Sequence, residues 1–103
     1  MLTTDETYSY RPPRDAAPTF TCRPLRSSDV ARVYDCEGLG SASMLAFRMG
    51  VVSIEGVETL KRGRDGLLTV AAVDELGLPF DVIRDVGSTV FERSELQEGE
   101  AKN

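Results

Sequence analysis

The two cysteines and the complete lack of histidine limit the chemistry that this 103-residue chain can perform. Without His there is no imidazole to act as a general base, to activate a Ser or Cys nucleophile, or to bind a metal. Cys22 and Cys36 are also too few for a four-thiolate zinc site. A disulfide between them is conceivable, but small secreted scaffolds usually carry several bridges. The favoured interpretation is therefore two buried free thiols in a reducing cytosol.

Acidic side chains lie close together at two places, Asp74–Glu75 and the pair Asp81 and Asp85, which is spaced by one helical turn. A general acid and a general base need carboxylates held in different environments, and nothing near these residues predicts such a difference. The sequence also lacks an Asp/Asn/Gly loop of the calcium-binding kind. Exposed helical charge explains these residues better. The sequence thus predicts a protein that is not an enzyme and has no catalytic residue, no cofactor and no metal.

Lys61, Arg62 and Arg64 form the basic cluster of the sequence, with glycines around them. They lack the spacing of a phosphate-binding loop, and the net charge of −5 opposes binding to nucleic acid. The following Asp65–Gly66 pair is a common hairpin signal. We interpret the cluster first as an exposed hairpin tip. Docking of an acidic protein partner remains an alternative, so these three cations are candidate partner-binding residues.

Residues 1–18 are expected to form an extended or disordered arm. Its three prolines are incompatible with a regular helix, and its polar residues show no apolar period. Yet the arm contains Tyr8 and Tyr10, two of the three tyrosines of the chain, followed by Arg11. Tyr and Arg often dominate protein interfaces. We weigh a solvated tail against a segment that becomes ordered on a partner, and take these three residues as candidate partner-binding positions.

A single globular domain is expected over residues 19–97, followed by a polar tail over 98–103. Alternation over residues 19–25 predicts a strand that is an edge strand or ends at Pro24. The β-branched run 51–54 predicts its antiparallel partner. Ser94 with Gln97 has capping-box spacing, which indicates that a further helical turn starts there. Other helices are expected to begin at Ser27 or Ser28, at Ser41 or Ser43, at Thr69 and at Pro79.

These elements predict an α+β fold, a small helix-dominated domain with a short antiparallel sheet and an extended N-terminal arm. The sequence has no apolar run of the roughly 20 residues that a membrane-spanning helix needs, and its polar, acidic start does not look like a signal peptide. No membrane partner is therefore expected. The apolar face of the helix that follows Pro79 is the clearest in the chain. The predicted core comprises Phe20, Val33, Leu45, Phe47, Leu76, Phe80, Ile83 and Val90.

Three stretches of the sequence, in this order and spacing, carry a family resemblance. They are Phe20–Asp29, a strand that runs into a capped helix; Gly50–Val57, the turn out of the second helix; and Leu78–Gly87, followed by Ser94–Leu96 and the terminal Lys102–Asn103. In these stretches the chain resembles the small tail-assembly proteins, or tail assembly chaperones, of long-tailed bacteriophages. The resemblance implies a non-enzymatic morphogenesis protein that binds tail structural proteins in the host cytoplasm.

Two alternatives to an assembly chaperone stay open. Members of this family often carry an aromatic residue in the second stretch, where this chain has Ser53 and Ile54. The Pro-rich, tyrosine-containing arm would also suit a structural component of the virion, in the tail or at the head–tail connection, that contacts neighbouring subunits. A small acidic regulator of a host protein is the third interpretation. Homo-oligomerisation is compatible with each of them.

Overall fold

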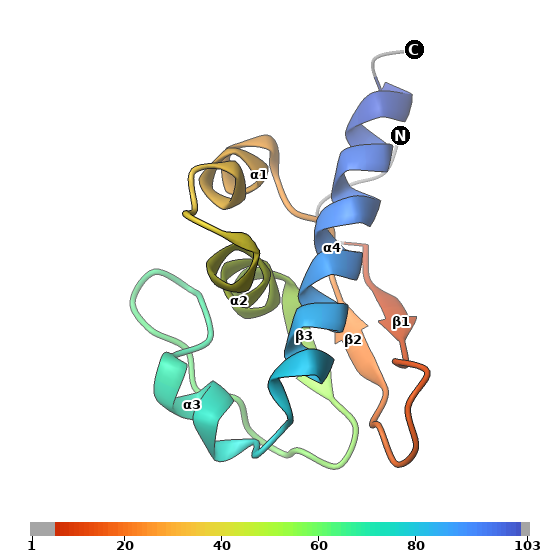
Figure 1. The fold of residues 1–103 in the computed structure, drawn as a ribbon, viewed down its shortest axis with the longest axis vertical. Helices are drawn as coiled ribbons and strands as arrows, with labels where there is room; N and C mark the ends of the chain where they lie inside the picture. The colour runs from red at the N-terminus through yellow and green to blue at the C-terminus, as the bar shows by residue number, and fades with distance from the viewer. Residues whose placement is uncertain (1–5, 102–103) are drawn as a thin grey trace.

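The computed structural model describes the backbone of residues 6–101 and the side chains of residues 6–95. Within this range the chain forms four helices and one three-stranded antiparallel sheet, which confirms the predicted α+β class. Figure 1 shows the long helix α4 running along the domain, with strands β1 and β2 on one side and helices α1 and α2 on the other. The elements are β1 (Tyr8–Tyr10), β2 (Phe20–Cys22), α1 (Ser27–Tyr34), α2 (Leu39–Gly50), β3 (Val51–Ile54), α3 (Val70–Glu75) and α4 (Phe80–Ala101).

The sheet has the strand order β1-β2-β3, so β2 is its central strand. The expected antiparallel pairing of β2 with β3 is confirmed, with Phe20 opposite Ile54. The alternative that the strand ends by Pro24 is also confirmed, because β2 stops at Cys22. The edge position is wrong, because β1 covers the other side of β2. Proline lacks the N–H that a paired strand donates, which is why a strand containing it is expected at a sheet edge. Because β2 ends before Pro24, this restriction does not apply to it.

Strand β1 belongs to the segment that was expected to be a separate arm. Tyr8 pairs with Cys22 and Tyr10 with Phe20, and both tyrosine side chains pack against the core. The Tyr10 hydroxyl donates a 3.0 Å hydrogen bond to Asp85 on α4. The extended backbone agrees with the prediction, but its separation from the domain does not. The prolines exclude a helix without excluding a strand, and the alternation of β1 turns both rings toward α4. Residues 1–5 lie outside the described range.

Helices α2 and α4 pack closely where glycines replace larger side chains. A Cβ atom added at Gly87 would lie 2.1 Å from the carbonyl oxygen of Ser43, and one added at Gly50 would lie 2.4 Å from Val90 Cγ1. The α2 ring of Phe47 then reaches β2, where it meets Phe20 edge-to-face at 5.9 Å. These close contacts hold α2 alongside α4 at both Ser43 and Gly50, and the contact at Ser43 determines the shape of the groove described below.

The predicted core is correct at five positions, namely Phe20, Val33, Phe47, Ile83 and Val90, which are all buried. Two others, Leu45 and Leu76, are half-buried and pack against that core. The prediction that Phe80 belongs to the core is wrong, because 46% of this residue is exposed. It is the first residue of α4, at the rim of the domain, and its ring covers Gly40 at the start of α2.

Several helix boundaries follow their expected caps and others do not. Thr69 caps α3 by accepting a 3.0 Å hydrogen bond from the Ala72 N–H, as predicted. Helix α2 begins at Leu39, earlier than expected, after Gly38 turns the chain with a φ of 97°. The expected new helical start at Ser94 is wrong, since α4 continues through it. Ser94 is buried there, donating to the Val90 carbonyl and accepting from the Leu25 N–H.

Candidate functional site

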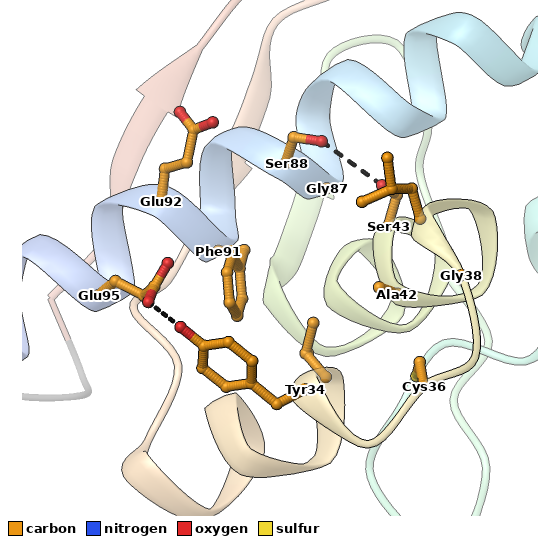
Figure 2. Close-up of a pocket in the computed structure, with 12 residues that line it drawn as sticks. Tyr34, Cys36, Gly38, Ala42, Ser43, Gly87, Ser88, Phe91, Glu92 and Glu95 are labelled. Atoms are coloured by element: carbon orange, nitrogen blue, oxygen red, sulfur yellow. Dashed lines mark hydrogen bonds between the residues drawn. The ribbon is translucent and has the colours of Figure 1, made fainter.

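A groove of about 500 Å³ lies between α1, the start of α2 and α4. Figure 2 shows its walls, with Tyr34 at the end of α1 on one side and the α4 side chains on the other. We call it the α1–α2–α4 groove. Its size falls in the range of protein ligand sites, which are mostly apolar with a few polar groups. It is lined by Val33, Tyr34, Cys36, Gly38, Leu39, Ala42, Ser43, Gly87, Ser88, Phe91, Glu92 and Glu95.

Small residues on α2 and α4 leave this groove open. Ala42 and Ser43 on α2 face Gly87 and Ser88 on α4, and the two serine hydroxyls lie 3.4 Å apart (Figure 2). The short distance between the two helices follows from their close approach at Gly87, where there is no room for a larger side chain. The sequence therefore builds a shallow floor of small side chains between two helices.

Large apolar side chains stand at the walls of the groove and stay exposed. Leu39, the first residue of α2, is 82% exposed, and Tyr34 is 65% exposed. The Tyr34 ring meets Phe91 edge-to-face at 5.2 Å, and its hydroxyl donates a hydrogen bond to the Glu95 carboxylate (Figure 2). Leaving a leucine in water forgoes about 1.5–3 kcal/mol of burial energy. Exposed apolar side chains around a hollow of this kind are typical of a binding surface.

The electrostatic character of the groove is acidic. Glu92 and Glu95 line it, and none of its described lining residues is Lys or Arg. Asp35 and Glu37, in the connection between α1 and α2, are also exposed. Two exposed cations lie outside the lining, Arg32 in the last turn of α1 and Arg84 one helical turn before Ser88 on α4. A ligand that enters next to Glu92 and Glu95 would therefore meet negative charge.

The two free cysteines occupy different environments. Cys36 lines the groove and is only half-buried, so the expectation that both thiols are buried is wrong for it. Cys22, on β2 opposite Tyr8 of β1, is buried in the core, and burial raises the pKa of its thiol to about 12, although the positive charge of Arg93 acts in the opposite direction. Burial, with a smaller contribution from Cys22, also raises the pKa of Tyr8 to about 12. Cys22 is therefore a structural thiol held in its protonated form.

Alkylation with iodoacetamide at pH 8 is expected to modify Cys36 much faster than Cys22. A pKa of about 12 leaves Cys22 with roughly a thousandth of the thiolate of an unperturbed cysteine, and burial slows access further. We expect a rate difference of roughly a hundredfold or more, measured by mass spectrometry of the two peptides. In 8 M urea the two cysteines should react at similar rates. Equal rates in the folded protein would show that Cys22 is not buried in solution.

The candidate residues Tyr8, Tyr10 and Arg11 lie away from the groove, at β1 and just beyond it. The Arg93 guanidinium of α4 lies 4.5 Å from the Tyr8 ring centre and 5.6 Å from that of Tyr10, so both rings help to hold β1 on α4. Arg11 is exposed. Their role as partner anchors stays a prediction.

The candidate residues Lys61, Arg62 and Arg64 lie in the loop before α3, where the expected hairpin is confirmed by an isolated antiparallel bridge between Arg62 and Leu68. Arg62 has structural contacts: it donates to the Val51 carbonyl at 2.7 Å and to the Gly66 carbonyl at 3.1 Å. Partial burial and the nearby charge of Arg23 lower its pKa. The structure therefore brings these three residues together with each other, but not with β1 or the groove. Their partner-binding role also stays a prediction.

Sequence analysis did not identify the groove as a site. The candidate residues that it names lie at β1 and in the loop before α3, away from the groove. The useful signal is the run Gly38–Leu39–Gly40, because a large apolar residue between two glycines has little of its own chain to pack against.

The described residues contain no group of three or more His, Cys, Asp or Glu side chains placed to hold a metal ion. Among the same residues, no helix is long and apolar enough to cross a membrane. In comparisons with protein-family models, curated proteins and solved structures, no match to this chain was found.

Proposed function

We propose that this chain is a non-enzymatic protein-binding protein and that the α1–α2–α4 groove is its binding surface. The observation that carries the proposal is the 82% exposure of Leu39 beside a groove walled by Tyr34 and Phe91. Leucine and aromatic side chains gain most from being covered by a partner, and aromatic residues are enriched at the centres of protein interfaces. The small floor residues leave room for side chains that the partner would insert.

The biological setting that we propose is the assembly of a long-tailed bacteriophage tail, with tail structural proteins as partners in the host cytoplasm. This part rests on the sequence resemblance in the stretches 20–29, 50–57 and 78–87. The second of these contains the last residue of α2 and all of β3, and the third contains the first two turns of α4. The alternative of a virion component relied on a free arm. Because Tyr8–Tyr10 pairs with β2, the described part of that arm gives the alternative no support.

The assembly proposal predicts that the chain binds a tail structural protein and is absent from finished particles. Each tail protein of the phage would be co-expressed with the tagged wild-type chain and with Leu39→Ser, which changes a side chain that is already exposed. We expect at least one tail protein to co-purify with the wild type and to be lost about tenfold with Leu39→Ser. Val70→Ser, at a 51% exposed position of α3, is the matched control and should behave as wild type.

Purified phage particles provide the complementary measurement. Quantitative mass spectrometry should find the chain well below one copy per tail. A stoichiometric amount in the particle would favour the virion-component alternative. Failure of every tail protein to co-purify would contradict the assembly role and would leave the host-regulator alternative.

A further inference from the structure

We infer that the α1–α2–α4 groove binds a short amphipathic helix of a partner protein whose apolar side chains are flanked by Lys or Arg. This inference rests on the proposed protein-binding function and specifies the chemistry of the partner. It follows from three properties of the described residues: the length of the groove along α4, the charge of its walls, and the distribution of exposed apolar side chains.

The length of the groove suits about two turns of helix. Its α4 wall runs from Gly87 to Glu95, which corresponds to about 12 Å at 1.5 Å per residue. A helix docked alongside would present side chains at i, i+4 and i+7 over the same distance, the spacing by which helices are read in apolar grooves. The floor of Ala42, Ser43 and Gly87 gives these side chains space, while Leu39 and Tyr34 provide apolar surface beside them.

The charge of the walls selects a basic helix. Glu92 is exposed, and Glu95 is half-buried under the Tyr34 hydroxyl. With no cation among the described lining residues, an acidic helix would face uncompensated repulsion, whereas Lys or Arg on a basic helix would pair with these carboxylates. After α1 the exposed Asp35 and Glu37 outnumber the exposed Arg32 of its last turn, so this end of the groove also favours cationic partners.

A second copy of this chain fits the groove poorly. A docking helix needs several exposed apolar side chains in one row, and among the side chains of residues 6–95 no helix of this chain offers more than one large exposed apolar residue. The chain is also acidic overall, with a net charge of −5, so two copies repel each other. Within residues 6–95 the large exposed apolar residues are distributed over five elements and comprise Tyr34, Leu39, Val52, Val70 and Phe80.

The test uses synthetic peptides and the full-length chain. The probe is a fluorescein-labelled 14-residue amphipathic helix with Leu at i, i+4, i+7 and i+11, flanked by Lys. A second peptide has Glu in place of every Lys, and a third has the composition of the first in scrambled order. Binding is measured by fluorescence anisotropy in 0.1 M salt. We expect saturable binding of the basic helix, at least tenfold weaker binding of the acidic helix, and no saturable binding of the scrambled peptide.

Matched variants locate the binding site. Leu39→Ser should weaken binding of the basic helix at least fivefold, and Glu92→Lys at least tenfold, because each removes a proposed contact from an exposed position. Val70→Ser and Glu58→Lys likewise replace an apolar residue by Ser and a Glu by Lys, at exposed positions outside the groove, and should stay within twofold of wild type. Circular dichroism melting of each variant checks that the fold is retained.

Each remaining outcome contradicts a defined part of the inference. Equal binding of acidic and basic helices, both weakened by Leu39→Ser, would overturn the charge preference and leave the proposed function intact. Equal loss with Glu92→Lys and Glu58→Lys would show general charge attraction instead of a site. If no peptide binds, the inference about a helical partner is overturned. The proposed function would then still be tested separately, by co-purification with tail proteins. A dimer by sedimentation that Leu39→Ser dissociates would show that a second copy occupies the groove.

Discussion

Gly87→Ala is expected to destabilise the protein by about 3 kcal/mol. The new Cβ atom would lie 2.1 Å from the carbonyl oxygen of Ser43, a backbone atom that cannot rotate away. Helices α2 and α4 would have to move apart, which would disturb the buried contacts between them. Urea unfolding followed by circular dichroism measures the loss, as a lower midpoint at an unchanged m-value. For a domain of this size the loss is a large fraction of total stability.

Gly40→Ala is the matched control for Gly87→Ala. It makes the same substitution in α2, but the new Cβ atom would lie 3.7 Å from the nearest Phe80 ring carbon, an ordinary contact. Removing a glycine from a helix reduces the entropy cost of folding, so this variant should be unchanged or more stable by up to about 1 kcal/mol. A Gly87→Ala variant as stable as Gly40→Ala would mean that the close α2–α4 approach is absent in solution.

Ile83→Ala and Phe80→Ala, one turn apart at the start of α4, are expected to differ strongly in effect. Ile83 is 5% exposed, and its truncation leaves a cavity that should cost about 2–5 kcal/mol. Phe80 is 46% exposed, so its truncation should cost about 1 kcal/mol or less. Thermal melting of the two variants distinguishes them. Equal losses would show that the Phe80 ring is buried in solution, as the sequence alone predicts.

The contrast between Phe80 and Ile83 illustrates how far the sequence predicts this fold. Helical periodicity correctly gives the apolar face of α4, and the Thr69 cap and the β2–β3 pair also follow from local signals. Periodicity cannot tell where along its length a helix leaves the core, so Phe80 was misassigned. The place of Tyr8–Tyr10 could not be predicted either, because an edge strand of three residues is stabilised by packing on α4, which no local pattern encodes.

The groove was less predictable than the fold, for a related reason. Sequence reasoning found residues whose chemistry is conspicuous, such as the tyrosines of β1 and the cations Lys61, Arg62 and Arg64. Arg62 instead ties its loop to β3 through the Val51 carbonyl. The groove depends on residues with little chemistry of their own. Ala42, Ser43 and Gly87 matter because small side chains from two distant segments meet, and this proximity exists only in the folded chain.

The central claim, that binding takes place in the α1–α2–α4 groove, is tested most directly by mapping where a ligand contacts the protein. The ¹⁵N-labelled full-length chain would be titrated with the basic amphipathic peptide while amide chemical shifts are recorded. We expect the largest shift changes in residues 34–43 and 87–95, which carry the groove lining, with the strands of the sheet nearly unchanged. Shift changes centred on Tyr8–Arg11 or on Lys61–Arg64 would contradict the claim and return the binding site to the residues that the sequence singles out.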